Sequence, residues 1–212
     1  MEPSSHARPR ETVAELETAI AACRVCRDRP IGSPLPHEPR PVAYLSATAR
    51  ILVAGQAPGT RVHASGLPFD DASGDRLRAW MGLDRAVFYD RARIAFLPMG
   101  FCFPGHDANG GDLPPRRECA ATWRARALAV MPAVDLVLAV GRPAQLWHLG
   151  KDARPSLGET VAAWRDILAR SAFPCVLPLP HPSWRNTGWL KRHPWFEADV
   201  VPRLRRLVAE RL

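Results

Sequence analysis

Three stretches of this chain combine residue types that can do chemistry, and the first is a short glycine-rich loop. It consists of Gly55, Gln56, Ala57, Pro58 and Gly59. Two glycines around a proline allow a tight turn whose backbone N–H groups can face a ligand. An ordinary turn between a strand and a helix has the same composition, so this loop alone leaves both interpretations open.

The same loop continues into a stretch with an aromatic ring and several carboxylates, L-P-F-D-D-A-S-G-D at residues 67–75. Phe69 can stack on a nucleobase, because every base has a π-face. Asp70, Asp71 and Asp75 supply carboxylates nearby, although Asp75 equally suits the first turn of a helix.

A second loop, H-P-S-W-R-N at residues 181–186, combines an imidazole with groups that suit a nucleic acid. His181 can donate a hydrogen bond to an oxygen that becomes anionic as a bond breaks. Ser183 and Arg185 can bind phosphates, and Trp184 can insert between stacked bases. The tripeptide H-P-S also arises by chance, so it carries little weight alone.

The cysteines form the third pattern. Cys23 and Cys26 make a C-x-x-C pair, whereas Cys102 and Cys119 are widely spaced across a loop rich in proline and glycine. Four thiolates suit a [4Fe–4S] cluster or zinc, but zinc ribbons usually carry two C-x-x-C pairs. A cluster, a zinc ion and buried thiols without metal therefore remain open. Cys175 lies in an apolar run and is expected to be a core thiol.

The elements that must position these loops follow from apolar patterning. Four short apolar runs predict buried strands at residues 50–55, 94–97, 134–141 and 173–179. Helical spacing predicts helices at residues 11–23, 73–81, 114–131, 142–149, 158–170 and 197–212. Strands that alternate with helices favour a parallel sheet covered on both faces. Loops at the carboxyl ends of such strands converge on one crevice, where we expect the chemistry.

Length and charge set the remaining expectations. A chain of 212 residues suits one α/β domain, here residues 11–212 after a disordered tail at residues 1–10. A net charge of +8, almost all from arginine, suits a polyanionic partner such as DNA, although solvated basic faces would look the same. The sequence lacks a long uncharged apolar run and an apolar leader, so we expect a cytoplasmic protein, by default a monomer.

These motifs together resemble a known family. G-Q-A-P-G followed by H-P-S resembles motifs A and B of the uracil-DNA glycosylase superfamily, and G-L-P-F-D-D-A-S-G-D-R-L at residues 66–77 resembles a stretch of its bacterial iron–sulfur branches, families four and five. The cysteine spacing also resembles the cluster ligands of those branches. The resemblance implies a three-layer α/β/α sandwich around a four-stranded, mostly parallel sheet. It also implies a structural [4Fe–4S] cluster on Cys23, Cys26, Cys102 and Cys119, with zinc less expected.

The resemblance also assigns roles. It implies a monofunctional glycosylase of base-excision repair that hydrolyses the bond to uracil, or to another deaminated base flipped out of DNA. It makes Phe69 the ring that stacks on the base and His181 the group that stabilises the departing base, and motif A contributes contacts to the substrate. Trp184 and Arg185 would contact the DNA, and Ser183 and Asn186 the substrate.

The chain departs from the family at the acid that handles water. The archetypal member has Asp where this chain has Ala57, and family four has Glu where this chain has Gln56. Family five also lacks a motif A acid and is thought to use an Asp before S-G. Asp71 matches that position, so we expect it to be the general base or cation stabiliser, with Asp70 second.

A second departure concerns base recognition. Family four places an Asn just after the second strand, where this chain has residues 97–100, L-P-M-G. Asn109 or Asn186 would have to substitute, or the pocket accepts hypoxanthine, xanthine or oxidised pyrimidines. His63 and His106 are candidates for the site, but surface or core positions are the favoured expectation.

Two alternatives to the enzyme remain. The first is a damaged-DNA-binding protein on the same fold, in which catalysis was lost together with the motif A acid. The second, weaker alternative is an iron–sulfur protein of another function, such as an enzyme of nucleotide metabolism.

Overall fold

The computed structural model describes residues 11–171 and 173–212, so the tail predicted at residues 1–10 lies outside the described residues. Its centre is a four-stranded parallel sheet in the order β2-β1-β3-β4. The strands are β1 (Ile51–Ala54), β2 (Ile94–Phe96), β3 (Leu136–Val140) and β4 (Cys175–Leu179). Each lies within a predicted strand, because a short apolar run bounded by turn residues fits a strand buried on both faces.

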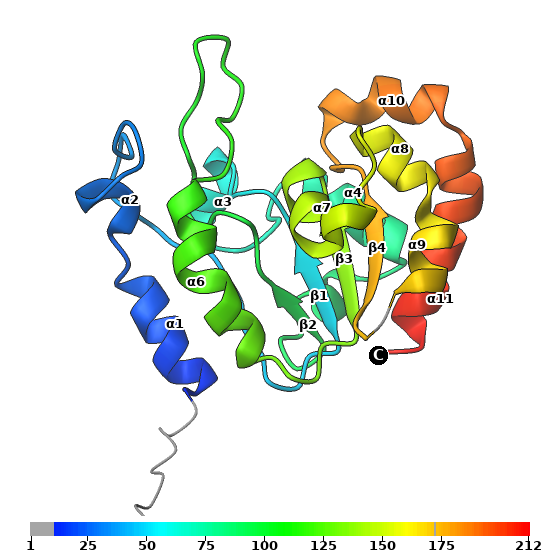
Figure 1. Cartoon of the computed structure of the whole chain (residues 1–212), viewed down its shortest axis with the longest axis horizontal. Helices are drawn as coiled ribbons and strands as arrows, with labels where there is room; N and C mark the ends of the chain where they lie inside the picture. Colours follow the sequence, from blue (N-terminus) through cyan, green and yellow to red (C-terminus); the bar gives the residue numbers. More distant parts are fainter. Residues whose placement is uncertain (1–10, 172) are drawn as a thin grey trace, which may run out of the picture.

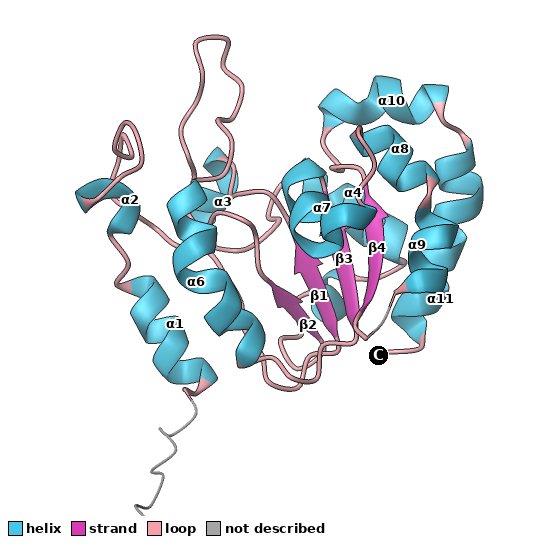
Figure 2. Cartoon of the chain, viewed as in Figure 1, coloured by secondary structure: helices cyan, strands magenta, loops and turns pink. Residues whose placement is uncertain are grey.

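Helices cover both faces of this sheet (Figure 1, Figure 2). The helices are α1 (Val13–Ala21), α2 (Val25–Asp28), α3 (Thr60–Ser65), α4 (Ala72–Met81), α5 (Arg85–Phe88), α6 (Arg117–Ala129), α7 (Arg142–Leu149), α8 (Leu157–Ala162), α9 (Trp164–Arg170), α10 (Thr187–Arg192) and α11 (Val201–Ala209). Short 3₁₀ turns occur at Gly150–Asp152 and Trp184–Asn186, and a π-helical turn at Phe196–Val200 leads into α11.

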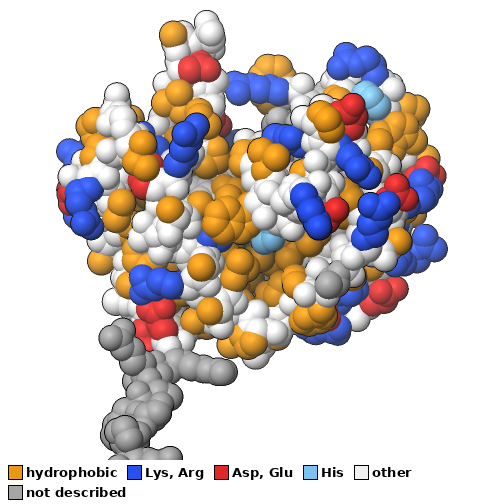
Figure 3. All heavy atoms as spheres, in the orientation of Figure 1, with side chains coloured by type: hydrophobic (Ala, Val, Ile, Leu, Met, Phe, Trp, Pro, Cys, Tyr) orange, Lys and Arg blue, Asp and Glu red, His pale blue; other side chains and the backbone are white. Residues whose placement is uncertain are grey.

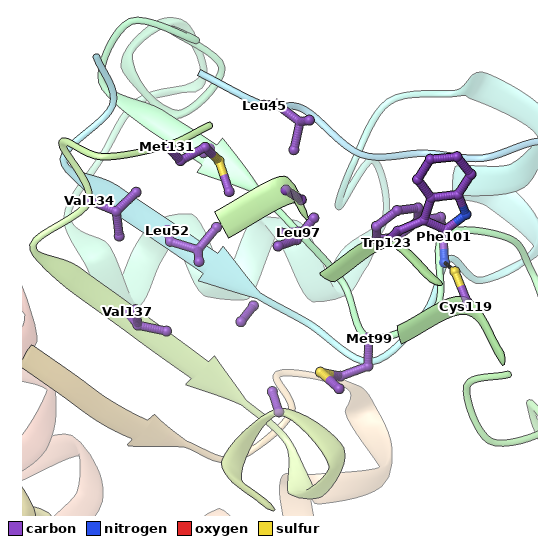
Figure 4. Close-up of a cluster of buried hydrophobic side chains, with 14 of the residues drawn as sticks. Leu45, Leu52, Leu97, Met99, Phe101, Cys119, Trp123, Met131, Val134 and Val137 are labelled. Carbon is purple, nitrogen blue, oxygen red and sulfur yellow. Dashed lines mark hydrogen bonds between the residues drawn. The ribbon is translucent and has the colours of Figure 1, made fainter. Parts of the chain in front are cut away.

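The strands divide their side chains between two cores, since successive residues of a strand point to opposite faces. In β1, Leu52 and Ala54 pack with α1, α6 and α7, whereas Ile51 and Val53 pack with α4, α5 and α11. Figure 4 shows the first core, with Leu52 and Val137 of the sheet facing side chains such as Leu97 and Met131. The predicted three-layer α/β/α sandwich is confirmed.

The structure divides two of the predicted helices and adds short ones. The helix expected at residues 158–170 is interrupted at Ala163, between α8 and α9. The last predicted helix begins as the π-helical turn. The added helices are α2, α3, α5 and α10, each of four to six residues. Such short helices bury too few residues to show a clear apolar period.

One long loop departs from the compact layers. It follows β2, rises above the carboxyl ends of the strands and returns at the start of α6 (Figure 2). We call residues 104–114 the lid. Its two sides are joined by a bridge between His106 and Asp112, and Asp107 N–H donates to the Gly111 carbonyl over 2.7 Å. Within the part of the chain that the structure describes, no helix has the length and apolar character needed to span a bilayer.

Candidate active site

A cavity of about 670 Å³ opens at the carboxyl ends of the strands. That is the edge at which ligands bind in open parallel sheets, because the loops leaving the strands converge there. The predicted site residues that line it are Gly55, Gln56, Ala57, Pro58, Gly59, Phe69, Asp71, His181, Ser183, Trp184, Arg185 and Asn186. The structure thus brings the motif A loop (residues 55–59), the Asp-rich stretch and the motif B loop (residues 181–186) around one space.

Asp70 is the exception among these predictions. It does not line the cavity; its carboxylate instead forms an ion pair with Arg85 at 3.0 Å. The hydrogen bond from Arg85 holds the pKa of Asp70 below its ordinary value. Neighbouring residues at the start of a helix point in different directions, so Asp71 faces the cavity while Asp70 turns towards α5.

Phe69 is held in place by its backbone as well as by its ring. It has a φ of 54°, in the left-handed region that non-glycine residues rarely adopt. The Tyr89 hydroxyl is within hydrogen-bonding distance of the carbonyls of Pro68 (2.9 Å) and Phe69 (3.2 Å). A Cβ on Gly74 would lie 1.7 Å from the Phe69 carbonyl oxygen, and one on Gly55 would lie 3.2 Å from its ring. Two glycines and a tyrosine therefore fix this ring at the cavity wall.

Asp71 has a structural role and a free oxygen. It is the N-cap of α4, and its Oδ1 accepts a hydrogen bond from the Gly74 N–H over 2.9 Å. Such a cap satisfies one of the unpaired donors of the helix and fixes the carboxylate. Since Oδ1 is committed to the helix, Oδ2 is the atom available to a molecule in the cavity.

His181 is a mostly neutral imidazole two residues after the end of β4. Burial lowers its pKa from the ordinary value, while the nearby carboxylates of Asp71 and Asp112 act in the opposite direction. At neutral pH a histidine with a lowered pKa carries one N–H donor and one acceptor nitrogen. Its own carbonyl accepts a hydrogen bond from Asn186 Nδ2 over 2.7 Å, which fixes the turn that follows.

The rest of the motif B loop is anchored from α4. Arg76 donates to the Ser183 carbonyl over 3.0 Å and to the Thr187 hydroxyl over 3.3 Å. Trp184 leaves 75% of its surface exposed, and the Arg185 guanidinium lies 5.7 Å from the centre of its ring. An exposed tryptophan beside a cation is suited to a polyanion that carries stacked rings.

All five residues of the motif A loop line the cavity. The amide of Gln56 lies against Gly141 at the end of β3, where a Cβ would come 2.4 Å from Gln56 Nε2. Gly141 also has a φ of 84°, which suits glycine. The Gln56 side chain therefore packs against the residue that follows β3, and neither Gln56 nor Ala57 supplies a carboxylate.

The lid contributes a residue that the sequence analysis missed. Asp112 lines the cavity, and its Oδ1 lies 3.2 Å from Nδ1 of His106. His106 Nε2 lies 3.2 Å from the Thr60 hydroxyl at the start of α3. Nothing in the local sequence marks Asp112, because the lid residues form an isolated bridge rather than a regular element. Its proximity to motif A depends on how a loop after β2 folds back.

Of the other candidate residues predicted from the sequence, some line the cavity and others lie away from it. Asn109 is at the exposed tip of the lid and does not line the cavity. The His63 ring packs between His37 and Phe103, with centroid distances of 4.4 and 6.0 Å, and burial lowers its pKa. Pro98 from the stretch after β2 lines the cavity without a side-chain donor. Asn186 is thus the only one of the proposed asparagines at the cavity.

The four cysteines lie on one side of the molecule, where α2 and α6 meet the loop after β2. Cys26, Cys102 and Cys119 are buried and Cys23 is half-buried. Trp123 Nε1–H donates to the sulfur of Cys23 over 3.1 Å and the Phe101 N–H to that of Cys119 over 3.3 Å; Figure 4 shows Cys119 beside Phe101 and Trp123. Burial raises the pKa of Cys26 to about 11 and that of Cys102 to about 12. Across the described ranges, no three His, Cys, Asp or Glu side chains form a site for a single metal ion.

Comparison with models of protein families identifies the family of this chain. The model of the uracil DNA glycosylase superfamily matches residues 42–205, which include all four strands, the cavity and the lid. The match covers both the glycine-rich loop after β1 and the histidine loop after β4. The chain therefore belongs to the uracil-DNA glycosylase superfamily.

Proposed function

We propose that this protein is a monofunctional DNA glycosylase that hydrolyses the N-glycosidic bond of uracil or another deaminated base flipped out of DNA. One observation carries the proposal: Phe69, Asp71 and His181 line the same cavity. These three side chains supply a stacking surface, a carboxylate and a hydrogen-bond donor, which are the groups that the reaction requires. Family membership supports a glycosylase; the choice of base is our inference.

The reaction separates charge, and the cavity is arranged to stabilise both ends. The C1′–N bond breaks, its electron pair stays on the base, and the sugar becomes cationic. A water oxygen then bonds to C1′ and transfers one proton to a carboxylate, which later returns it to solvent. The base leaves after taking a proton, and the DNA keeps an abasic sugar. Charge that develops in this way is best stabilised by groups already held in position.

The residues divide this work by chemistry. Phe69 stacks on the extruded base, and the neutral His181 donates its N–H to a base oxygen as negative charge develops there. Asp71 uses the oxygen that does not cap α4 to accept the proton of the attacking water. The carbonyl and amide groups of the motif A loop, together with Ser183 and Asn186, orient the base at the cavity wall.

DNA would approach the face that carries Trp184 and Arg185. Trp184 inserts into the stack where the base has left, which offsets part of the cost of a few kcal/mol for extrusion. Lys and Arg side chains are spread over the surface seen in Figure 3, so binding should depend on salt. We propose that the protein acts on DNA as a monomer in the cytoplasm, and size-exclusion chromatography with scattering tests the monomer.

The residues around the cysteines fit an iron–sulfur cluster. Three of the sulfurs are buried among apolar side chains, and two sulfurs already accept N–H donors, which stabilise anionic sulfur. A single zinc ion would need ligand atoms about 4 Å apart, given Zn–S bonds of about 2.3 Å, and no three His, Cys, Asp or Glu side chains of the described residues form a site of that kind. We therefore propose that Cys23, Cys26, Cys102 and Cys119 hold a structural [4Fe–4S] cluster, which would tie α2 and α6 to the loop after β2.

The cluster can be tested without measuring activity. Anaerobically purified protein should show a broad visible absorbance and contain iron and acid-labile sulfide in equal amounts. Cys26→Ser should remove both, whereas Cys175→Ser, outside the group, should not. Zinc without iron in fresh protein, or no metal at all, would contradict the proposal.

The activity is tested on single- and double-stranded oligonucleotides that each carry one altered base. We expect release of free uracil or hypoxanthine, and at least a hundredfold slower release by Asp71→Asn and His181→Ala. Asp71→Asn keeps an oxygen that can cap α4, so a loss of rate would reflect lost charge rather than lost structure. Unchanged rates in both variants would refute the assigned roles.

A second function is favoured by the motif A loop, which carries no carboxylate at Gln56 or Ala57. A protein that binds damaged DNA without cleaving it would need the stacking ring and the exposed tryptophan but not the acid. It would retain altered DNA in a salt-dependent manner and form no abasic product over long incubations. The same oligonucleotide panel separates the two functions.

A further inference from the structure

The lid carries a second carboxylate to the cavity, in addition to that of Asp71. Asp112 lines the cavity, and its Oδ2 lies 3.6 Å from the position that a Cβ on Gly59 would occupy. Gly59 is the last residue of the motif A loop. A carboxylate from a distant part of the chain therefore lies against the loop that has lost its own.

This carboxylate is held by contacts that leave one oxygen open. Oδ1 of Asp112 lies 3.2 Å from His106 Nδ1, and the Thr60 hydroxyl lies 3.2 Å from His106 Nε2. If Nδ1 carries the proton, the imidazole donates a hydrogen bond to Asp112, and its other nitrogen accepts a hydrogen bond from the Thr60 hydroxyl. Thr60 directly follows motif A, so the chain of contacts ties the lid to that loop. Oδ2 is the oxygen on the side of Gly59.

The tip of the lid has a further contact with the motif B loop. Arg185 reaches the Gly110 carbonyl over 3.4 Å, a long hydrogen bond. The lid thus touches both loops that define the site, which makes it a wall of the cavity. In the isolated protein the Asp112 side chain is 51% exposed. DNA placed over the cavity would cover it, and a charge shielded from water acts more strongly on its neighbours.

Resting on the function proposed above, we infer that Asp112 supplies the carboxylate that motif A lacks and stabilises the cationic sugar while the C1′–N bond breaks. Asp71 accepts the proton of the attacking water, and Asp112 stays ionised throughout, so no atom is transferred to it. Support comes also from His181, whose pKa both carboxylates raise against the effect of burial. The positive charge on the sugar would lie between two acids.

The test measures recognition of a positive charge rather than turnover. The probes are two duplexes with an abasic analogue, one a pyrrolidine that is cationic at neutral pH and one an uncharged tetrahydrofuran. The wild-type protein should bind the pyrrolidine duplex at least tenfold more tightly, and Asp112→Asn should lose most of that preference. Asp112→Glu should restore part of it. Affinity for undamaged DNA should stay equal or increase in Asp112→Asn, because a negative charge near phosphates is removed.

The lid itself provides the matched control. Asp107→Asn makes the same change of charge on the same loop, and its amide oxygen can still accept from the N–H groups of Asn109 and Gly111, which now donate to Asp107 over 2.8 Å. Asp107 does not line the cavity. This variant should keep the full preference for the pyrrolidine duplex. Equal preferences in Asp112→Asn and Asp107→Asn, or no preference in the wild type, would overturn the inference.

Failure of the glycosylase proposal gives a different result. A protein that releases no base from any oligonucleotide, yet loses its pyrrolidine preference through Asp112→Asn, would have the charge site without the activity. A protein that releases base at an unchanged rate after Asp112→Asn would have the activity without this role for Asp112. Where both proposals hold, we expect Asp112→Asn to slow base release about a hundredfold.

Discussion

Gly74→Ala should distort the cavity and slow base release, although alanine is the best helix former. Gly74 is in the first turn of α4, where a Cβ would lie 1.7 Å from the carbonyl oxygen and 2.9 Å from the Cβ of Phe69. Contacts of this kind are not made below about 3 Å, so the Phe69 carbonyl must move by more than about 1 Å. The movement cannot be shared easily, because Tyr89 holds that carbonyl and Phe69 already has a strained φ.

The expected effect has two parts of opposite sign. Replacing a helical glycine by alanine gains about 0.5–1 kcal/mol, but the forced displacement costs about 1–3 kcal/mol. We therefore expect a net loss of about 1–2 kcal/mol in the free energy of unfolding. Moving the stacking ring by about 1 Å should slow base release about a hundredfold. The stability loss alone leaves most of the protein folded, so the rate would fall further than stability explains.

The assay pairs urea unfolding with base release measured at a single turnover. The matched control is Gly188→Ala in α10, where the nearest atom to the added Cβ is a guanidinium nitrogen of Arg192 at 3.8 Å. That variant should be slightly more stable and equally active. If Gly74→Ala unfolds at the same urea concentration as the wild type and releases base at the same rate, the close contact with Phe69 is not a constraint.

Three further changes test other parts of the structure. Trp184→Ala should weaken binding to DNA with an extruded base by about 1–3 kcal/mol, measured by fluorescence anisotropy. Phe173→Ala removes an equally exposed ring outside the cavity and should leave this affinity unchanged. Equal losses of affinity would refute the insertion of Trp184 into the base stack. Burial beside Arg124 lowers the pKa of His148 from 6.5 to about 3, so between those pH values the unfolded chain binds a proton that the native protein does not. The free energy of unfolding should therefore fall by about 1.4 kcal/mol for each pH unit below 6.5, and urea titrations of His148→Gln should lack this component; parallel pH curves would contradict it. Arg124→Met removes a fully buried guanidinium that donates to two backbone carbonyls after β2, and should lower the free energy of unfolding in urea by about 2–4 kcal/mol. Arg126→Met, on the exposed side of α6, should lower it by less than about 1 kcal/mol. A smaller loss at Arg124 than at Arg126 would exclude a role for Arg124 in holding the segment after β2.

The sheet was predictable because its strands carry a simple signal. Each strand is a short, uninterrupted apolar run that ends in a glycine, proline or polar residue, and burial on both faces requires that pattern. The edge that holds the site followed from the parallel arrangement alone. Cys175 was placed correctly in a strand, although it is half-buried rather than fully enclosed.

The features that escaped prediction depend on folding between distant segments. Asp70 and Asp71 are neighbours of identical type, and only the start of α4 decides which of them faces the cavity. Asp112 is in a loop without periodicity. It contacts His106, which in turn contacts Thr60 beside motif A, although His106 and Thr60 are 46 residues apart in sequence. Side-chain directions in such loops follow from packing, for which the local sequence holds no pattern.

The order of the strands also bears on how activity is gained and lost. The loops that form the two ends of the site leave β1 and β4, which are not neighbours, and β3 must pair with both before the loops face each other. Since Ile51 pairs with Leu136 and Leu136 with Cys175, the two loops face each other only when β1, β3 and β4 are all paired. We therefore expect the site to form cooperatively as the whole chain folds. Splitting the protein between β3 and β4 should give two pieces without function, and mixing them should restore function only when the sheet re-forms.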